Sequence, residues 1–296
     1  MIRIEGLYKR FAETVAVDGV SLQIASGETF GLLGPNGAGK STTLQLIMGI
    51  LTPDRGSVTF SGNRDPRELA ARRQLGFAPQ QLSLYEELSG QENLKFFSRI
   101  YGLKGNRQQQ QIDWALELTG LQNRAQDPVK TYSGGMKRRL NLALAVVHDP
   151  SLILLDEPTV GIDPQSRYHL FDNIEQLQAE GRTIVYTTHY MDEAQRLCDR
   201  IAIIDRGRIL ALDTVDALVT QYGGRSEVRV ELADVAVDTG SLPGTLTGHM
   251  LQWKSDTPLV ELAALAAAAV SVRSIEITRP NLETVFLNLT GHKLRD

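Results

Sequence analysis

The sequence predicts an α/β fold in which a parallel sheet with crossover helices is followed by a smaller α+β unit. Short apolar or β-branched runs recur at Thr29–Leu33, Leu152–Leu155, Thr183–Thr187 and Ile201–Asp205, and helical segments separate them. A glycine-rich octapeptide stands between the first of these runs and a helical segment. Beyond Gly223–Gly224 the chain changes to a different rhythm, which indicates a second domain. We expect strands there at Ser226–Leu232, Leu246–Trp253 and Val272–Thr278, a helix near Leu259–Ala269 and a last helix at Pro280–Leu289.

Size and charge are those of a folded protein with room for two unequal domains. The chain has 296 residues, of which 22% are charged and 42% hydrophobic, and its formal net charge is -4. This balance gives no sign of a nucleic-acid-binding surface. A single cysteine, Cys198, makes no internal disulfide and is consistent with a reducing compartment.

The sequence shows no segment of its own that would enter a membrane. The start MIRIEGLYKRF carries charges where a secretory signal would be apolar. The longest apolar stretch, Leu262–Val272, has about half the length needed to cross a bilayer. We therefore expect that any work at a membrane is done through a partner.

The segment before the octapeptide predicts two strands, Ile2–Leu7 and Val20–Ile24, joined by a turn through Lys9–Asp18. Phe11 is the aromatic residue in that expected turn. A lone aromatic residue is usually part of a core, but one placed near a phosphate loop can stack on an adenine.

The octapeptide Gly34–Ser41 reads GPNGAGKS and fits G-x-x-x-x-G-K-[ST] at all four fixed positions. A loop whose backbone N–H groups all point at an anion needs dihedral angles that glycine reaches at low cost, and the motif holds three glycines. The helix expected at Ser41–Met48 adds its own N–H groups and the positive end of its dipole. We therefore expect a P-loop NTPase core, with Lys40 on the β- and γ-phosphates and the Ser41 hydroxyl on Mg²⁺.

A helical region follows two further predicted strands, Ser57–Gly62 and Leu75–Pro79. From Tyr85 to His148 apolar residues recur at helical spacing. Its last helix, Lys137–Val147, follows Tyr132-Ser133-Gly134-Gly135-Met136, and Ser133 is a natural N-cap. Ser-Gly-Gly at a helix start is a second candidate anion site, although a plain cap would have the same residues.

Polar side chains end two of the predicted parallel strands. Leu152–Leu155 runs into Asp156 and Glu157, which places both acids at the carboxyl edge of the sheet, beside the phosphate loop. Because side chains alternate along a strand, we expect the two acids to point to opposite faces and to differ in role. Asp156 is the candidate for the Mg²⁺ shell, and Glu157 for polarising the water that attacks the γ-phosphorus. The alternative is a pair of solvated acids at a strand end.

Thr187-Thr188-His189 ends the following strand in the same way. An imidazole at that position can donate to the γ-phosphate and hold the water and Glu157 in line. Taken alone, a histidine is more often structural, and its position at the end of this strand favours the functional interpretation.

These motifs occur in an order that resembles one known family. The set of Gly34–Ser41, Gln80, Ser133–Gly135, Leu152–Pro158, Gly161–Asp163 and His189 resembles the ATP-binding subunit of ABC transporters over about residues 1 to 220. The resemblance implies ATP and Mg²⁺ as ligands. It also implies an ATPase domain at residues 1–222, with an antiparallel β subdomain and an inserted helical subdomain at about residues 85–150. Residues 225–296 would then form a small accessory α+β domain, to which we assign no chemistry.

The resemblance also assigns roles. Phe11 would stack on adenine, and Gln80 would touch both Mg²⁺ and the attacking water. Asp163 would link two active sites, while Ser133 and Gly135 would bind the γ-phosphate of a nucleotide held by another subunit. ATP would then be sandwiched between two head-to-tail copies of the chain.

The expected nucleotide-binding residues are Phe11, Gly34, Pro35, Asn36, Gly37, Ala38, Gly39, Lys40, Ser41, Thr42, Ser133, Gly134, Gly135 and Asp163. The expected catalytic residues are Lys40, Gln80, Glu157 and His189. The expected Mg²⁺ ligands are Ser41, Gln80 and Asp156.

The chain departs from the family pattern in two features, the signature around Ser133 and the aromatic residue at position 11. The commonest signature has leucine and glutamine where this chain has Tyr132 and Met136. Met136 cannot hydrogen-bond as glutamine does, which puts its share in phosphate contact in doubt. Phe11 replaces a more usual tyrosine and can still stack.

Two later segments, Thr188–Ala194 and Arg279–Gly291, resemble bacterial type-2 ABC exporters of the drug and antibiotic resistance kind. In that subfamily the membrane domain is a separate protein. We therefore expect a cytoplasmic ATPase, peripheral to the cytoplasmic face of the inner membrane, that dimerises around two Mg-ATP and powers a separate permease. Contact with the permease is expected at Gln80–Glu92.

Two alternatives come from other functional classes. A soluble ABC protein that acts on ribosomes or DNA would resemble two cassettes in one chain, or would carry a long coiled-coil insert, and this chain has neither. A nucleotide-sensing module without turnover is disfavoured by the presence of Glu157 and His189.

Overall fold

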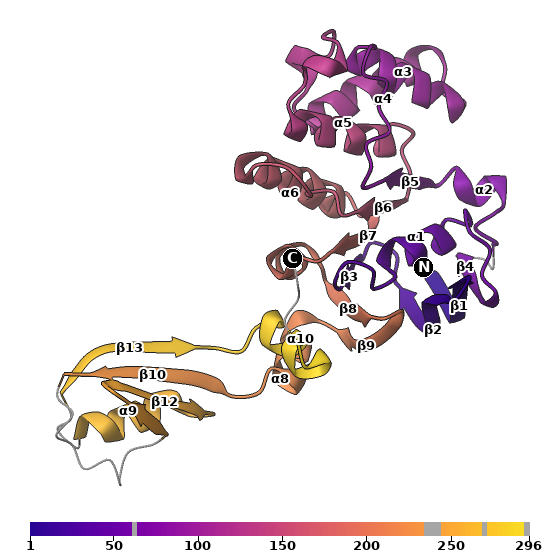
Figure 1. Cartoon of the computed structure of the whole chain (residues 1–296). Coiled ribbons are helices and arrows are strands. Elements are labelled where there is room, and N and C mark those ends of the chain that lie inside the picture. The colour runs from indigo at the N-terminus through magenta and orange to yellow at the C-terminus, as the bar shows by residue number, and fades with distance from the viewer. Residues whose placement is uncertain (61–63, 234–243, 268–270, 293–296) are drawn as a thin grey trace. The chain divides into compact units, whose positions relative to one another are not determined.

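The computed structural model describes residues 1–60, 64–233, 244–267 and 271–292 (Figure 1). The chain divides into two compact units, one of residues 1–214 and one that begins at Val215. The sequence placed the boundary at residues 222–225. The division comes earlier because α8 (Val215–Tyr222) packs against α10 (Leu282–Thr290), and the Asn288 amide donates to the Tyr222 carbonyl at 2.7 Å.

A mixed sheet forms the centre of the first unit. Its strands are β3 (Thr29–Leu33), β5 (Leu75–Ala78), β6 (Leu152–Asp156), β7 (Thr183–Thr188), β8 (Arg200–Asp205) and β9 (Arg208–Asp213). They lie in the order β5-β6-β7-β3-β8-β9, and only the β8–β9 pair among them is antiparallel. Every residue of β3, β6 and β7 is buried, as is usual for parallel strands covered on both faces. The predicted α/β class is confirmed.

A smaller antiparallel sheet packs beside it, with the strand order β2-β1-β4. Its strands are β1 (Ile2–Phe11), β2 (Thr14–Ile24) and β4 (Arg55–Phe60). The expected turn at Lys9–Asp18 is wrong, because Phe11 pairs directly with Thr14. The two strands continue to a tight turn at Ala12 and Glu13, where Ala12 takes a φ of 49°, and the Lys9 ammonium donates to the Asp54 carboxylate at 2.8 Å.

The helices of the first unit are α1 (Lys40–Ile47), α2 (Leu69–Arg72), α3 (Gly90–Ile100), α4 (Gly105–Leu118), α5 (Gly134–Val146), α6 (Pro164–Ala179) and α7 (Met191–Leu197). Helices α3, α4 and α5 lie together at the top of Figure 1 and share a core that includes Leu94, Ile112 and Leu140. Helix α5 begins three residues before the expected Lys137. The Ser133 hydroxyl makes this start possible, because it accepts the Met136 N–H at 3.2 Å.

An apolar core covers each face of the mixed sheet. On one face, α1 and the antiparallel sheet bury residues such as Ile4, Leu44 and Val185. On the other face, α5, α6 and α7 contribute to a core that includes Ile174 and Tyr186. The sheet is thereby held rigidly between two cores, which fixes the loops at its edges.

The second unit has its own antiparallel sheet, in the order β11-β12-β10-β13. Its further elements are β10 (Ser226–Leu232), β11 (Thr245–Thr247), β12 (Met250–Ser255), α9 (Pro258–Ala267) and β13 (Val272–Thr278). The sequence suggested one strand over Leu246–Trp253, which is wrong. Leu246 pairs with Leu251 across a hairpin, and Gly248, with a φ of 62°, provides its turn. The expected helix end at Ala269 lies outside the described residues.

Within the part of the chain that the structure describes, no helix has the length and apolarity needed to span a bilayer.

Candidate functional site

The predicted phosphate loop lies between the end of β3 and the start of α1, at the carboxyl edge of the mixed sheet. Two of its glycines are required for space. A Cβ on Gly34 would lie 2.1 Å from the carbonyl oxygen of Ile204, and one on Gly39 would lie 2.3 Å from that of Ala16. Gly39 also takes a φ of 102° as it begins the helix. The first N–H groups of α1 have no intrahelical partners and are suited to an anion.

Lys40 returns over this loop and is 4% exposed. Its ammonium donates to the carbonyl oxygens of Gly34 at 2.7 Å and Pro35 at 3.0 Å. It also lies 2.9 Å from Oε1 of Glu157, which is 5% exposed. The structure therefore pairs the predicted phosphate-binding lysine with the predicted general base.

The two adjacent acids do not point to opposite faces, contrary to the expectation from strand alternation. Asp156 is the last residue of β6, and its Oδ1 accepts from the Ser41 hydroxyl at 3.0 Å and the Thr187 hydroxyl at 2.7 Å. Glu157 has left the strand and takes a φ of 44°. Its N–H donates to the Thr187 hydroxyl oxygen at 3.0 Å, which turns its side chain toward the same loop. Both carboxylates therefore face the phosphate loop.

Side chains from other loops converge on the second oxygen of Glu157. The Gln80 amide, just beyond β5, donates to Oε2 at 3.2 Å. Nδ1 of His189, just beyond β7, lies 3.2 Å from the same oxygen but without the geometry of a hydrogen bond. The structure thus brings all four predicted catalytic residues together, and their individual roles stay predictions.

The oxygen atoms predicted to bind Mg²⁺ fit that ion in chemistry. Ser41 Oγ and Asp156 Oδ1 are 3.0 Å apart, and Gln80 lies across the same space, on the side of Glu157. Hydroxyl, carboxylate and amide oxygens are the hard ligands that Mg²⁺ prefers, usually together with substrate phosphates. Among the described residues, no cluster of three or more His, Cys, Asp or Glu side chains offers a competing metal site.

The predicted second anion site, Ser133–Gly135, lies at the start of α5. A Cβ on Gly135 would lie 2.0 Å from the Ser166 hydroxyl oxygen, so this glycine packs directly against α6. Ser166 in turn donates from its N–H and its hydroxyl to the carboxylate of Asp163, at 2.9 Å and 2.7 Å. These two donors lower the pKa of Asp163.

The residues around Ser133 and Asp163 are separate from those around Lys40. Within the described ranges, no hydrogen bond or ion pair joins Ser133–Gly135 or Asp163 directly to Lys40, Ser41 or Glu157. A single chain therefore presents two distinct groups of predicted nucleotide-binding residues.

The two departures from the family pattern have structural explanations. Tyr132 is 5% exposed, and its hydroxyl donates to the Arg124 carbonyl at 2.6 Å, inside the helical core. Met136 is partly buried against the same core, which gives its side chain a packing role. Phe11, by contrast, is 45% exposed at the end of β1, and its ring is available for stacking.

Sequence reasoning missed two residues that organise the site. Thr187 bonds both acids, as described above. Glu193 on α7 is fully buried and accepts from four donors: Thr159 Oγ1 at 2.6 Å, Arg167 Nε at 2.9 Å, Tyr186 Oη at 2.9 Å and Thr188 Oγ1 at 2.6 Å. It therefore joins the loop after Glu157 to the strand end that carries His189. The sequence signals for Glu193 were its place in the segment Thr188–Ala194 and an acid beside the apolar positions Ala194 and Leu197.

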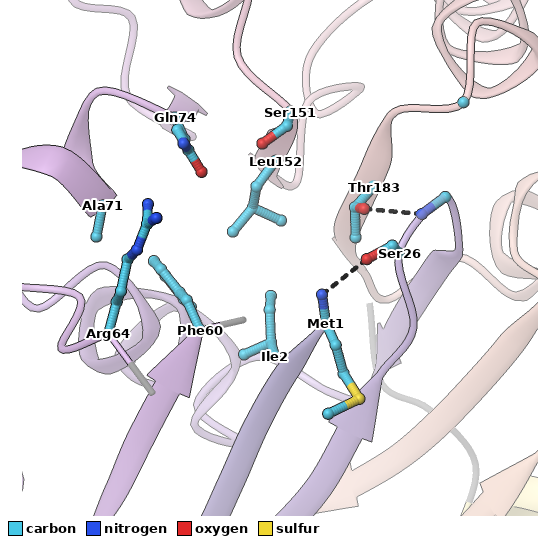
Figure 2. A pocket seen from close by; sticks show the side chains of 12 residues that line it. Met1, Ile2, Ser26, Phe60, Arg64, Ala71, Gln74, Ser151, Leu152 and Thr183 are labelled. Atoms are coloured by element: carbon cyan, nitrogen blue, oxygen red, sulfur yellow. Dashed lines mark hydrogen bonds between the residues drawn. The ribbon is translucent and has the colours of Figure 1, made fainter. Parts of the chain in front are cut away.

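A pocket of about 180 Å³ lies at the opposite, amino edge of the sheet (Figure 2). Its lining includes Leu152 and Thr183, where β6 and β7 begin, together with Phe60 and Gln74. It contains none of the predicted nucleotide-binding or catalytic residues. The pocket of Figure 2 and the polar side chains around Glu157 therefore lie at different places in the molecule.

Comparisons with known proteins agree with a nucleotide site at the residues around Glu157. A family model described as "ABC transporter" matches residues 17–160. The chain is similar to the linearmycin resistance ATP-binding protein LnrL of Bacillus subtilis, with 40% identity over 311 residues and full coverage of both chains. It is also similar to the Nod factor export ATP-binding protein I of Cupriavidus pinatubonensis, with 40% identity, covering 100% of this chain and 92% of that one. The daunorubicin resistance ATP-binding protein DrrA3 of Streptomyces coeruleorubidus is 36% identical over 99% of this chain and 97% of its own.

Solved structures give the same result for most of the chain. The structure of an ATP-binding subunit of an ABC transporter matches with a TM-score of 0.67 and 31% identity, covering 75% of this chain and 93% of that one. A dimeric ATP-binding cassette in a post-hydrolysis state with ADP and Pi matches with a TM-score of 0.66 and 26% identity, covering 72% and 98%.

Proposed function

The chain belongs to the family of ABC transporter ATP-binding proteins, and from this premise we propose that it hydrolyses ATP to power export through a separate membrane-spanning subunit. The observation that carries the proposal is the convergence of Lys40, Gln80 and His189 on Glu157 beside the phosphate loop. The relatives are named for linearmycin resistance, daunorubicin resistance and Nod factor export. One of these names refers to export and the three refer to different compounds, so the proposal extends to export and not to a particular cargo.

ATP binding uses the phosphate loop and the end of β1, the central strand of the antiparallel sheet. The backbone N–H groups of residues 36, 37 and 39–42 surround the β- and γ-phosphates, and the Lys40 ammonium adds charge to the same point. For this, Lys40 exchanges part of its contact with the Gly34 and Pro35 carbonyl oxygens for phosphate oxygens. The exposed ring of Phe11 stacks on the adenine.

Hydrolysis requires a water in line with the bond between the β- and γ-phosphates. Glu157 accepts a proton from that water, and Gln80 and His189, each 3.2 Å from its Oε2, orient the water and the carboxylate. The His189 imidazole, whose Nδ1 has no hydrogen bond within the described residues, donates to the γ-phosphate in this proposal. Ser41, Asp156 and Gln80 would hold Mg²⁺, which would supply positive charge against the negative charge of the phosphates.

The separation of the two groups in one chain favours a dimer. Ser133 and Gly135 serve the γ-phosphate held by a second copy, and Asp163 lies between the two sites. In a head-to-tail arrangement each copy completes the site of the other, so one interface holds two ATP molecules. ATP binding then closes the dimer and hydrolysis opens it.

The membrane-spanning subunit would bind near the segment Gln80–Glu92, at the cytoplasmic face of the membrane. Exposed apolar side chains gather there, on and before α3: Leu82, Tyr85, Phe96 and Ile100. Tyr85 packs edge-on against Phe96, with 5.1 Å between ring centroids. A groove of about 530 Å³ beside them is lined by Leu88, Phe96 and Ile100, among others. This surface begins close to Gln80 in the sequence. A movement of the membrane-spanning subunit would therefore displace Gln80, the residue that orients the water.

Replacing Glu157 by Gln tests the catalytic assignment. The variant keeps the shape and loses the base, so we expect ATP hydrolysis to fall about a thousandfold or more while ATP binding remains. ATP should then trap a dimer, measured by size-exclusion chromatography with light scattering. The matched control is Glu117→Gln, which changes an exposed carboxyl on α4. Normal turnover in Glu157→Gln would overturn the general-base role.

Replacing Glu86 and Glu87 by lysine tests the docking surface. Their carboxylates pair with Lys137 at 2.6 Å and Lys130 at 2.7 Å, and both remain largely exposed. Charge reversal should reduce recovery of the membrane subunit from detergent extract, with the melting temperature as a check on folding. If the unmodified chain or the lysine variant instead recovers ribosomal protein or DNA, the result would favour a soluble ABC protein that acts on ribosomes or DNA.

A further inference from the structure

The helix that begins with the Ser-Gly-Gly motif carries two consecutive arginines with different partners. Arg138 donates from Nη1 to the Gln80 carbonyl oxygen and from Nη2 to the Val160 carbonyl oxygen, the latter at 2.9 Å. Arg139 donates from Nη1 to the carbonyl oxygens of Thr119, at 2.6 Å, and Gly120, at 3.4 Å. One guanidinium therefore points toward the catalytic edge and the other toward the end of α4.

The two carbonyl groups held by Arg138 lie on either side of Glu157. Gln80 uses its side chain to donate to Glu157 Oε2 at 3.2 Å, while its backbone is held by Arg138. Val160 closes the turn after Glu157, since its N–H donates to the Glu157 carbonyl at 3.3 Å. A single planar group thus fixes the backbone of both segments that position the general base.

Arg138 also interacts electrostatically with Glu157. Burial lowers the pKa of the Arg138 guanidinium, and the carboxylate of Glu157 opposes that shift. The guanidinium remains charged at any physiological pH. Its two bonds are therefore charge-assisted, which makes them stronger than neutral ones.

Arg138 also lies close to the start of α5. Arg138 lies four residues after Gly134, one helical turn into α5, so it moves with the N–H groups of Ser133–Gly135. In the proposed dimer those groups bind the γ-phosphate of the partner's nucleotide. A small displacement of the helix start would therefore reach the Gln80 and Val160 carbonyl groups without passing through any flexible segment.

We infer that Arg138 is a positioning residue that couples the two ATP sites of the dimer. It aligns Gln80 and Glu157 in its own subunit when α5 engages the nucleotide of the partner. This role rests on the proposed function, because it requires the head-to-tail dimer. It adds a residue outside the predicted motifs to the set that controls hydrolysis.

The competing explanation is a structural cross-link, and Arg139 provides the matched comparison. Both arginines are half-buried on the same helix, both bond two carbonyl oxygens, and burial lowers the pKa of each. Arg139 differs in that its carbonyl partners, Thr119 and Gly120, belong to the helical region and have no contact with Glu157.

The experiment compares Arg138→Met with Arg139→Met in the full chain. Methionine keeps an apolar stem of similar reach and removes the donors. For Arg138→Met we expect kcat to fall about 10- to 100-fold, corresponding to the loss of charge-assisted bonds. The ATP concentration at half-maximal rate should change less than about threefold, and the Hill coefficient should fall toward one. For Arg139→Met we expect a lower melting temperature with kcat and Hill coefficient unchanged.

Three results would be decisive against the inference or its premise. If Arg138→Met loses only thermal stability, as Arg139→Met does, Arg138 is a structural cross-link. If the unmodified chain hydrolyses ATP with a Hill coefficient of one, and Glu157→Gln forms no dimer with ATP, the proposed dimer fails and the coupling fails with it. Arg138→Lys guards against poor folding of the methionine variant. Its ammonium can hold one carbonyl firmly but not both, so coupling predicts an intermediate Hill coefficient and a cross-link predicts the normal one.

Discussion

The two edges of the mixed sheet are built from the same strands and differ in almost everything else. At the carboxyl edge, Lys40, Asp156 and Glu157 are buried and every one of them bonds a neighbour. At the amino edge, the starts of β6 and β7 help to line the pocket of Figure 2, whose other lining side chains are apolar or polar and include the charged Arg64. The difference teaches that a hollow does not identify a site of chemistry. Buried, opposed charges that are held in place by other elements are the better indicator.

The largest expected effect comes from removing the lysine of the carboxyl edge. Lys40→Met removes the ammonium that pairs with the buried Glu157 and that would bind the phosphates of ATP. We therefore expect ATP affinity and turnover each to fall about a hundredfold or more. Titration with a fluorescent ATP analogue and phosphate-release assays measure the two quantities. The control is Lys104→Met, an exposed lysine before α4, which should leave both unchanged.

A sharper comparison uses the two ends of a single strand, β7. The hydroxyl of Thr187 donates to Asp156 and accepts from the Glu157 N–H, whereas the hydroxyl of Thr183 accepts from the Gly27 N–H at 2.9 Å. Thr187→Val should lower kcat about 10- to 100-fold, since it removes hydrogen bonds to a charged group. Thr183→Val should cost about 1 kcal/mol of unfolding free energy.

In the Thr183→Val protein, turnover per folded molecule should stay within about twofold, as expected for a position remote from the chemistry. Urea denaturation and ATPase assays on both variants give the answer. Equal losses of turnover at the two ends would show that the edges are not functionally distinct.

The third prediction concerns pH and the amino edge. His148 stacks on Tyr101, with ring centroids 3.5 Å apart, and its Nε2 contacts the carbonyl of Leu75, the first residue of β5. Burial lowers the pKa of His148 to about 4. The folded state therefore favours the neutral ring, so this stabilisation is complete above pH 6.5 or so and is lost as the pH falls toward 4.

Between pH 7.5 and 5.5 the expected loss attributable to His148 is about 1 kcal/mol of unfolding free energy. Urea denaturation at several pH values measures it. His148→Gln keeps a donor for the Leu75 carbonyl and cannot titrate, so its unfolding free energy should lack this part of the pH dependence. An identical pH dependence in the two proteins would contradict the assignment.

The smallest expected effect comes from filling the pocket itself. Ala71 is 2% exposed and belongs to the lining of the 180 Å³ pocket. Ala71→Leu should change the unfolding free energy by no more than about 1 kcal/mol, since the added methyl groups enter existing space. ATP hydrolysis should be unaffected. A large loss of hydrolysis would mean that the amino edge communicates with the nucleotide.

Much of this organisation could be predicted from the sequence because the signals are local. The strands β3, β6 and β7 are uninterrupted apolar or β-branched runs, and the phosphate loop between β3 and α1 is a contiguous motif. Rules of strand direction were then sufficient to place Glu157 and His189 at the same edge.

What could not be predicted depends on residues far apart in the chain. The extension of β1 to Phe11 depends on its pairing with β2, and its Lys9 contacts Asp54, which lies after α1. The left-handed backbone of Glu157, stabilised by Thr187, turned an expected alternation of acids into a pair facing one way. The difference between Arg138 and Arg139 is likewise invisible in the sequence, because only the folded chain shows which carbonyl groups each arginine reaches.

The close contact between Gly135 and Ser166 constrains how this protein can change over generations. Any side chain at position 135 would overlap the Ser166 hydroxyl, and Ser166 is the residue that holds Asp163. Alanine at 135 is therefore tolerable only if position 166 loses its side chain first, which would leave Asp163 with the backbone donor alone. Positions 135 and 166 should therefore change together or not at all. A chimera that takes residues 132–136 from another protein would also need the start of α6 from that protein.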